Sequence, residues 1–315
     1  MVSMASSVGA GWECVKHDRP IPTRPLTAYN GNKSLARGVA MADNPTQFQD
    51  NLPPGVDLNR PSVARIYDYL LGGYHNFEID RQAATKFAAL FPDLFLTAQV
   101  NRAYLRRAAA FVSSQGIDQF IDLGSGIPTV GNVHEVVRQN NPAARVVYVD
   151  IEPVAIAHAQ TILEGDPNLA AILADVRRPD EILNHPRTRE LIDFSKPVGL
   201  FAVALLHYIL DDAQAESVID AFKDAIPSGS YLVIGVWTAD DAPREVMEKY
   251  AEMSQTLSTS GAPRPREKVI RYFRGFEILP PGLVHSPQWR PDGPDDLFVD
   301  EPGRSVTWVG VARKP

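Results

Sequence analysis

The segment from Asp122 to Asn132 has the clearest chemical signature in the sequence. It reads Asp-Leu-Gly-Ser-Gly-Ile-Pro-Thr-Val-Gly-Asn and begins inside a short apolar run at 120–123. Glycines such as Gly124 and Gly126 lack a Cβ atom, so they allow a tight turn and a close approach of the backbone to a ligand. A turn of this kind between a strand and a helix is typical of a site for a nucleoside cofactor.

Two more acids end the next two predicted strands. Asp150 ends the run at 145–150, which places it 24 residues after Gly126 (150 − 126), and Asp175 ends the run at 170–175. An acid in the position of Asp150 accepts hydrogen bonds from the ribose hydroxyls of a nucleoside. Asp175 is placed to accept a hydrogen bond from an adenine amino group. Asp122 or Asp175 alone has the alternative role of capping the segment that follows it.

The spacing of the glycines separates two classes of cofactor. A dinucleotide site has the pattern G-x-G-x-x-G, whereas here the glycine after Gly126 is Gly131. The carboxylate of Asp122 would repel a pyrophosphate, but it suits a ligand with a positive charge. S-adenosylmethionine carries an ammonium and a sulfonium and no phosphate. The sequence therefore favours S-adenosylmethionine, and an NAD-dependent oxidoreductase is a remote alternative.

These residues require a sheet that brings strand ends together. Short apolar runs alternate with helical patterns from residue 116 onward, and this alternation predicts a parallel sheet with helices on both faces. We expect an α/β fold with a Rossmann-like sheet of seven strands, mostly parallel, that closes with an antiparallel C-terminal strand. The predicted strands are 120–123, 145–150, 170–175, 198–205, 231–237, 283–286 and 305–311.

The region before the sheet divides into two further parts. Residues 1–45 lack periodicity, and their first 40 residues hold five basic and two acidic side chains, so we expect a disordered tail or an extension upstream of the true start. Residues 46–115 have helical periodicity and predict a helical cap. Ser62 is placed to cap its first helix, and Gly72-Gly73 is placed to end it. Residues 116–315 then form the α/β domain.

The composition excludes several functional classes. The chain has 31 basic and 38 acidic residues and a net charge of −7, so no extended basic surface for nucleic acid is expected. Cys14 is the single cysteine of the sequence, which excludes an internal disulfide framework and a cysteine-rich metal site. No apolar run approaches the ~20 residues that span a membrane. We expect a cytoplasmic protein, monomeric or homodimeric, that acts on a small molecule without nucleic-acid or membrane partners.

Several motifs resemble a bacterial family of S-adenosyl methyltransferases with no assigned substrate. The resemblance covers about residues 50–315 and implies a class I, Rossmann-like methyltransferase that binds S-adenosylmethionine and releases S-adenosylhomocysteine. The motifs that resemble class I methyltransferases in general are Asp122–Gly126, Asp150, Asp175 and Ile226–Ile234. Those that resemble the narrower family are Arg60–Gly73, Asn101-Arg102, Gly126–Thr129, Asn132–Val136, Tyr148–Asp150, Asp175–Arg177, Leu206–Tyr208 and Pro287–Pro291.

The sequence and the resemblance together give the candidate site. We expect the cap to act as a lid in which Tyr69 and Gly73 cover the cofactor. No metal is expected, because His134 and Glu135 lack a third ligand at metal spacing. The candidate cofactor-binding residues are Asp122, Gly124, Ser125, Gly126, Thr129, Asn132, Asp150, Ile151, Asp175, Val176 and Ala204, with Arg65, Tyr69, Gly72 and Gly73 from the cap.

The candidates for catalysis follow the fourth predicted strand. Methyl transfer requires alignment of the reactants, and it requires a base only when the nucleophile must lose a proton. His207 would be such a base if its pKa were near neutrality, and Tyr208 would pack against the sulfonium or line the acceptor site. The alternative roles are packing or capping for His207 and core packing for Tyr208. A regulatory protein that binds the cofactor without catalysis is the alternative function.

Overall fold

The computed structural model describes residues 56–128, 131–240 and 242–315. The predicted tail at 1–45 and the candidate residue Thr129 lie outside these ranges. The described residues belong to one compact unit, Ala42–Pro315. None of the described helices combines the length and the apolar character needed to cross a membrane.

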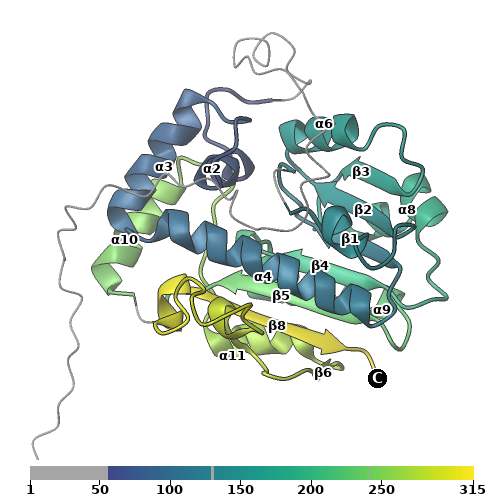
Figure 1. The fold of residues 1–315 in the computed structure, drawn as a ribbon. Helices are drawn as coiled ribbons and strands as arrows, with labels where there is room; N and C mark the ends of the chain where they lie inside the picture. The colour runs from purple at the N-terminus through teal and green to yellow at the C-terminus, as the bar shows by residue number, and fades with distance from the viewer. Residues whose placement is uncertain (1–55, 129–130, 241) are drawn as a thin grey trace, which may run out of the picture. The chain divides into compact units, whose positions relative to one another are not determined.

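An eight-stranded sheet forms the centre of the fold (Figure 1). Its order is β3-β2-β1-β4-β5-β8-β6, and β7 also pairs with β8. The first five strands are parallel, and β8 is antiparallel to β5. The strands are β1 Gln119–Leu123, β2 Arg145–Asp150, β3 Leu169–Leu173, β4 Gly199–Val203, β5 Tyr231–Trp237, β6 Glu277–Ile278, β7 Val284–His285 and β8 Thr307–Arg313.

The sheet confirms the predicted fold class and adds one strand to it. All seven predicted strands are present in some form, and the eighth is β6, which has two residues. A two-residue strand is too short to give a periodic signal in the sequence. It forms because its residues pair with Ala312 and Arg313 at the end of β8.

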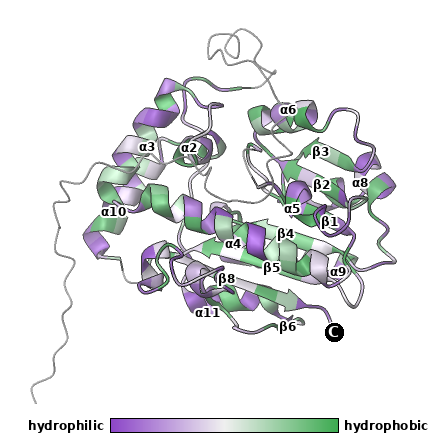
Figure 2. Ribbon diagram, viewed as in Figure 1, coloured by the Kyte–Doolittle hydropathy of each residue, from purple (hydrophilic) through white to green (hydrophobic). Residues whose placement is uncertain are grey.

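Helices cover both faces of the sheet, and the strands between them are the hydrophobic centre (Figure 2). One face packs against α4, α5 and α6, and the other packs against α7, α8, α9 and α11. The described helices are α2 Val63–Leu70, α3 Glu78–Leu90, α4 Leu94–Ser114, α5 Val133–Val137, α6 Pro153–Ile162, α7 Pro179–Leu183, α8 Pro186–Leu191, α9 Asp212–Ala225, α10 Arg244–Ser254, α11 Arg266–Val269, and the short 3-10 turns η1 Leu206–Tyr208, η2 Ile270–Phe273, η3 Ser286–Gln288 and η4 Pro302–Ser305.

A separate apolar cluster holds the helical cap together. It joins α2, α3 and the start of α4, and residues of α10 and the following loop complete it, among them Tyr250 and Leu257. Ser62 precedes α2, and its hydroxyl accepts a hydrogen bond from the backbone N–H of Arg65. The cap therefore depends on a segment almost 200 residues away in the chain, since Tyr250 lies 188 positions after Ser62 (250 − 62).

Gly72 and Gly73 end α2 for a local reason. Gly72 has a φ of +81°, which L side chains adopt only with strain. A Cβ atom on Gly73 would lie 2.0 Å from Oδ1 of Asp68. The buried Asp68 carboxylate accepts hydrogen bonds from the N–H of His75 and the Nδ2 of Asn76, each at 2.8 Å. The two glycines thus allow the turn to fold onto Asp68.

Candidate active site

The glycine turn after β1 is held against β2. The backbone N–H groups of Gly124 and Ser125 both donate to the carbonyl of Val149, at 2.8 and 3.1 Å. Gly124 and Gly126 each have a φ of +66°. A Cβ atom on Gly124 would lie 2.6 Å from the side chain of Leu205, whereas a Cβ on Gly126 would meet no atom within 4 Å. The turn therefore faces open space at Gly126, as a ligand cradle requires.

Asp150 lies at the end of β2 beside this turn. Its Oδ2 accepts a hydrogen bond from the N–H of Gly126 at 2.7 Å, and its Oδ1 accepts one from the N–H of Glu152 at 2.8 Å. A carboxylate has about four acceptor positions, so these two bonds leave room for other donors. Burial raises the pKa of Asp150, and these backbone hydrogen bonds oppose that rise. The geometry can accept two ribose hydroxyls.

Asp122 and Arg102 are two buried charges that the described protein leaves unpaired. Asp122 in β1 is 5% exposed and Arg102 in α4 is 6% exposed. Within the described ranges neither side chain forms a hydrogen bond or an ion pair, although the charge of Arg102 lowers the pKa of Asp122. Burial raises the pKa of Asp122 to about 7, and this effect exceeds that of Arg102. Burial of an unpaired charge destabilises a protein. A ligand that carries both a cationic and an anionic group would pair these two side chains.

Asp175 has an arginine partner within the protein. Its carboxylate accepts hydrogen bonds from Nε of Arg177 at 2.9 Å and from NH2 at 2.6 Å. The backbone N–H of Arg177 donates to it as well, at 2.9 Å. Both residues line the cavity. An adenine amino group would therefore compete with Arg177 for this carboxylate. The sequence did not predict the pairing of Asp175 with Arg177.

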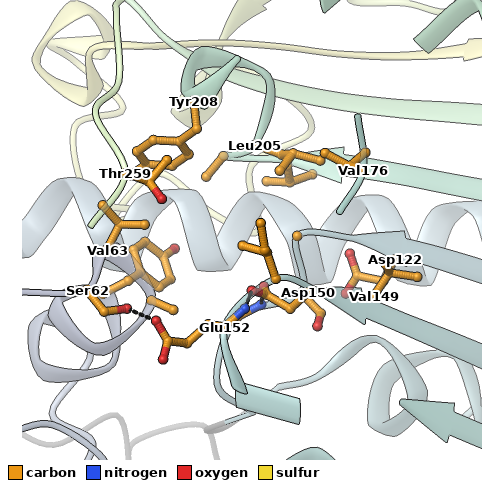
Figure 3. Close-up of a pocket in the computed structure, with 18 of the residues that line it drawn as sticks. Ser62, Val63, Asp122, Val149, Asp150, Glu152, Val176, Leu205, Tyr208 and Thr259 are labelled. Carbon is orange, nitrogen blue, oxygen red and sulfur yellow. Dashed lines mark hydrogen bonds between the residues drawn. The ribbon is translucent and has the colours of Figure 1, made fainter. Parts of the chain in front are cut away.

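A single cavity brings together most of the predicted cofactor residues (Figure 3). In Figure 3, Asp122 and Asp150 lie on the side away from Ser62, Val63 and Thr259 of the cap and its loop. Asn132 lies apart from this cavity, in a small adjoining pocket that also contacts Asp122 and Arg102. The predicted residues that line the main cavity are Asp122, Gly124, Ser125, Gly126, Asp150, Ile151, Asp175, Val176, Ala204 and Tyr208.

The cap lines the cavity with residues other than the predicted ones. Ser62, Val63, Ala64 and Tyr67 form the cap wall, which is one face of α2 and its N-terminal end. Arg65, Tyr69, Gly72 and Gly73 do not line it. Positions four apart share a face of a helix, so 63 and 67 lie together while Tyr69 points elsewhere and packs edge-on against Phe95.

Arg65 links the cap to the sheet domain instead. It is 1% exposed, and its Nε lies 2.8 Å from Oδ2 of Asp80. Its NH1 lies 3.4 Å from Oε1 of Glu152, which precedes α6. Its NH2 donates to the carbonyls of Asp57 and Arg60. The guanidinium is saturated by the protein, which favours a structural role.

His207 is buried beneath the cavity wall. It is 6% exposed, and its Nδ1 accepts a hydrogen bond from the N–H of Trp237 at 3.3 Å. Burial, and to a smaller extent the charge of Arg264, lower its pKa to about 3. This corrects the expectation of a pKa near neutrality. A neutral, buried imidazole that accepts a backbone hydrogen bond is suited to packing rather than to proton transfer.

We expect His207→Asn to retain methyl transfer within about threefold, because its amide oxygen can replace Nδ1 as the acceptor from Trp237. Loss of a general base would instead reduce the rate by about 10²- to 10⁴-fold. The pH profile of the transfer rate should also be unchanged. Urea unfolding as a function of pH gives a second measurement. The pKa of His207 in the folded state lies below the value of 6.5 for the unfolded state. His207 therefore lowers the free energy of unfolding of the wild type as the pH falls from 6.5 toward 3. In the variant, this contribution to the pH dependence of stability should be absent.

Sequence reasoning missed several lining residues, above all Tyr67, Asn101, Arg102, Glu152 and Leu205. Asn101 and Arg102 were part of a motif that resembles the family, but the sequence alone assigned no function to them. A buried arginine is rare without a partner, yet burial of Arg102 depends on how α4 crosses the sheet. The signal for Tyr67 was available, because it lies four residues after Val63 on the helix that Ser62 caps.

The sheet order, the glycine turn and the charges that line the cavity define a Rossmann-like methyltransferase that uses S-adenosylmethionine. The chain belongs to the S-adenosyl methyltransferase family, whose model matches residues 49–315. This confirms the resemblance, the enzyme class and the cofactor that the sequence predicted. No curated protein is similar enough to the chain to count as a match.

Two solved structures are similar to this chain over most of its length. One is a protein of Thermobifida fusca YX assigned provisionally as a methyltransferase, with 42% identity and a TM-score of 0.77, covering 83% of this chain and 98% of its own. The other is a DUF574 family protein of Streptomyces avermitilis MA-4680, with 33% identity and a TM-score of 0.74, covering 81% and 98%. Neither description names a methyl acceptor.

Proposed function

We propose that this protein methylates a small molecule, with the cofactor held along the glycine turn and the strand ends that carry Asp122 and Asp150. The observation that carries this proposal is that Arg102 and Asp122 are buried and that neither forms a hydrogen bond or an ion pair within the described residues. S-adenosylmethionine ends in an α-amino acid, so its carboxylate suits Arg102 and its ammonium suits Asp122. Charge-assisted hydrogen bonds of this type are the strong ones in proteins. Asp150 would accept hydrogen bonds from the ribose.

The adenine would lie against the apolar part of the cavity. Ile151 is 53% exposed although it is a large aliphatic residue. Val176 and Leu205 line the same cavity, and in Figure 3 they lie above Asp150. A planar base would cover these exposed side chains. Burial of apolar surface of this kind contributes roughly 25 cal/mol per Å².

The chemistry supplied by the bound cofactor is an electrophilic methyl group: an acceptor lone pair bonds to its carbon, and the carbon–sulfur pair remains on sulfur. The protein contributes alignment, which is the main requirement of such a displacement. Ala204, at the end of β4, has a φ of +58°. A strained backbone is common where a ligand is held, and the carboxyl end of β4 lies where ligands bind in such sheets.

The acidic composition and the single cysteine support a cytoplasmic protein without a nucleic-acid partner. We also propose that it acts as a monomer or a homodimer. Incubation with methyl-labelled S-adenosylmethionine and a fractionated bacterial metabolite extract tests the function. We expect label in a small-molecule fraction. Label in nucleic acid or protein alone would contradict the proposal, and cofactor binding without transfer to any fraction would favour a regulatory binding protein.

The pKa of Asp122 gives cofactor binding a defined pH dependence. Below its pKa of about 7 the carboxyl holds a proton, which a bound ammonium must displace. Affinity for S-adenosylmethionine should therefore fall by up to about 20-fold from pH 7.5 to 5.5. Asp122→Asn should bind more weakly and without this dependence. Methylthioadenosine, which lacks the amino acid, is the matched ligand and should show a flat profile in calorimetric titrations.

A further inference from the structure

The cavity continues beyond the cofactor residues toward the cap. There Val63 and Tyr67 of α2 form one wall, and Tyr208 of η1 and Thr259 of the loop after α10 form another. Figure 3 shows Tyr208, Thr259 and Val63 grouped on the side of the cavity away from Asp122 and Val176. This cap half of the cavity is thus built from three segments that are distant in sequence.

Hydrogen bonds outside the cavity fix these segments to one another. The N–H of Ser258 donates to the carbonyl of Pro61 at 2.8 Å, which ties the loop to the start of α2. The N–H of Ala262 donates to the carbonyl of His207 at 2.8 Å, which ties the same loop to η1. The Tyr67 hydroxyl donates to the carbonyl of Ala98 at 3.2 Å. The cap half is therefore shaped before any molecule enters, and such preorganisation favours binding.

The guanidinium of Arg102 lies 5.7 Å from the centre of the Tyr67 ring, but the carboxylate of the proposed cofactor pairs it, so charge is otherwise balanced in this half. Its carboxylate is that of Glu152, which accepts hydrogen bonds from the hydroxyl of Ser62 and from NH1 of Arg65. A charged molecule placed here would lose water without gaining an unpaired partner, and that exchange is unfavourable. The pattern selects for an uncharged occupant.

Some polar groups that line this part of the cavity form no hydrogen bond with the described residues, among them Oδ1 of Asn101 and the hydroxyl of Tyr208. The ring of Tyr208 lines the cavity. Burial, with Tyr250 and Tyr67 nearby, raises the pKa of Tyr208, so the hydroxyl keeps its proton and is available as a donor. The rings of Tyr67 and Tyr208 supply flat apolar walls, which suit planar molecules.

We propose that the cap half of the cavity is the acceptor subsite, and that it takes an uncharged, planar aromatic molecule with an oxygen or nitrogen that accepts a hydrogen bond from Tyr208. This rests on the proposed function, because the subsite has meaning only beside a bound cofactor. It names the substrate class of the same site. Neutrality follows from the paired Glu152, and planarity follows from the two tyrosine rings.

Isosteric probes that differ only in charge test the proposal. Benzamide, benzamidine and benzoate, with the corresponding 2-naphthyl set, are titrated into the full chain saturated with S-adenosylhomocysteine. We expect at least one neutral amide to bind 10-fold more tightly than both of its charged isosteres. Tyr208→Phe should weaken that binding about fivefold, and Val63→Trp, which fills the subsite, should abolish it. Tyr74→Phe is the matched control, since Tyr74 is 83% exposed, and it should bind as the wild type does.

The results distinguish a failure of the acceptor proposal from a failure of the cofactor proposal. Binding of S-adenosylhomocysteine should remain within twofold in Tyr208→Phe and Val63→Trp. If it does, and a charged isostere binds as tightly as its amide, or Tyr208→Phe leaves amide binding unchanged, or no probe binds, the acceptor proposal is overturned and the cofactor proposal stands. Failure of the wild type to bind S-adenosylhomocysteine would instead overturn the proposed function.

Discussion

Arg102→Met is expected to weaken S-adenosylmethionine binding by about 30- to 150-fold, which corresponds to about 2–3 kcal/mol for loss of a charge-assisted hydrogen-bonded pair. The cause is direct, because the cofactor carboxylate loses the guanidinium that would bind it, and the Nε of this guanidinium has no hydrogen bond within the described residues. A secondary effect acts in the same direction. Arg102 lowers the pKa of Asp122, so its removal favours the protonated carboxyl and weakens the hold on the ammonium.

The ligand series makes this prediction specific. Methylthioadenosine has the same adenine and ribose but no amino acid, and its affinity should change less than twofold in Arg102→Met. Arg244→Met is the control variant, because Arg244 is a surface residue whose partner is Glu248 on the same helix. Calorimetry measures both ligands. An equal loss for both ligands would mean that Arg102 supports the fold of the site rather than the amino acid end.

Asp150→Ala is expected to weaken S-adenosylmethionine, S-adenosylhomocysteine and methylthioadenosine alike, by about 10- to 150-fold, or about 1.5–3 kcal/mol for two hydrogen bonds to a charged group. All three ligands share the ribose that the carboxylate would hold. The same carboxylate also accepts the N–H groups of Gly126 and Glu152, so part of the loss could arise from a looser turn.

A ligand without ribose hydroxyls separates these two causes. Binding of 2′,3′-dideoxyadenosine should be nearly equal in the wild type and in Asp150→Ala if the hydroxyls are the partners. A large loss of this ligand as well would assign the effect to the turn. A drop of under twofold for S-adenosylmethionine itself would refute the ribose assignment. Arg102→Met and Asp150→Ala therefore test separately how the protein binds the amino acid end and the nucleoside end of the cofactor.

The sequence predicted the elements that short-range patterns encode. The alternation of apolar runs and helical periods predicted the parallel sheet, and the stop at Gly72-Gly73 and the cap at Ser62 follow from local backbone requirements. The turn at Gly124 and Gly126 and the acid at Asp150 lie together in one cavity because consecutive parallel strands end at the same edge of a sheet.

The rest of the site depends on contacts that no local pattern contains. Arg102 is buried because α4 packs across β4 and β5, and its neighbours in sequence give no sign of this. The cap wall comes from Val63 and Tyr67 rather than Tyr69 because α2 turns that face toward the cavity. Arg177 engages Asp175 only because their side chains fold back on the loop after β3. In each case tertiary packing decides which side chains line the cavity, and residue spacing alone does not predict the result.

Titration calorimetry of the full chain with S-adenosylmethionine, S-adenosylhomocysteine and NAD shows whether Asp122, Arg102 and Asp150 form a cradle for this cofactor. We predict saturable binding of the first two ligands, about one per chain, and no saturable heat from NAD, whose pyrophosphate would meet the carboxylate of Asp122. Saturable NAD binding without binding of S-adenosylmethionine would contradict the account.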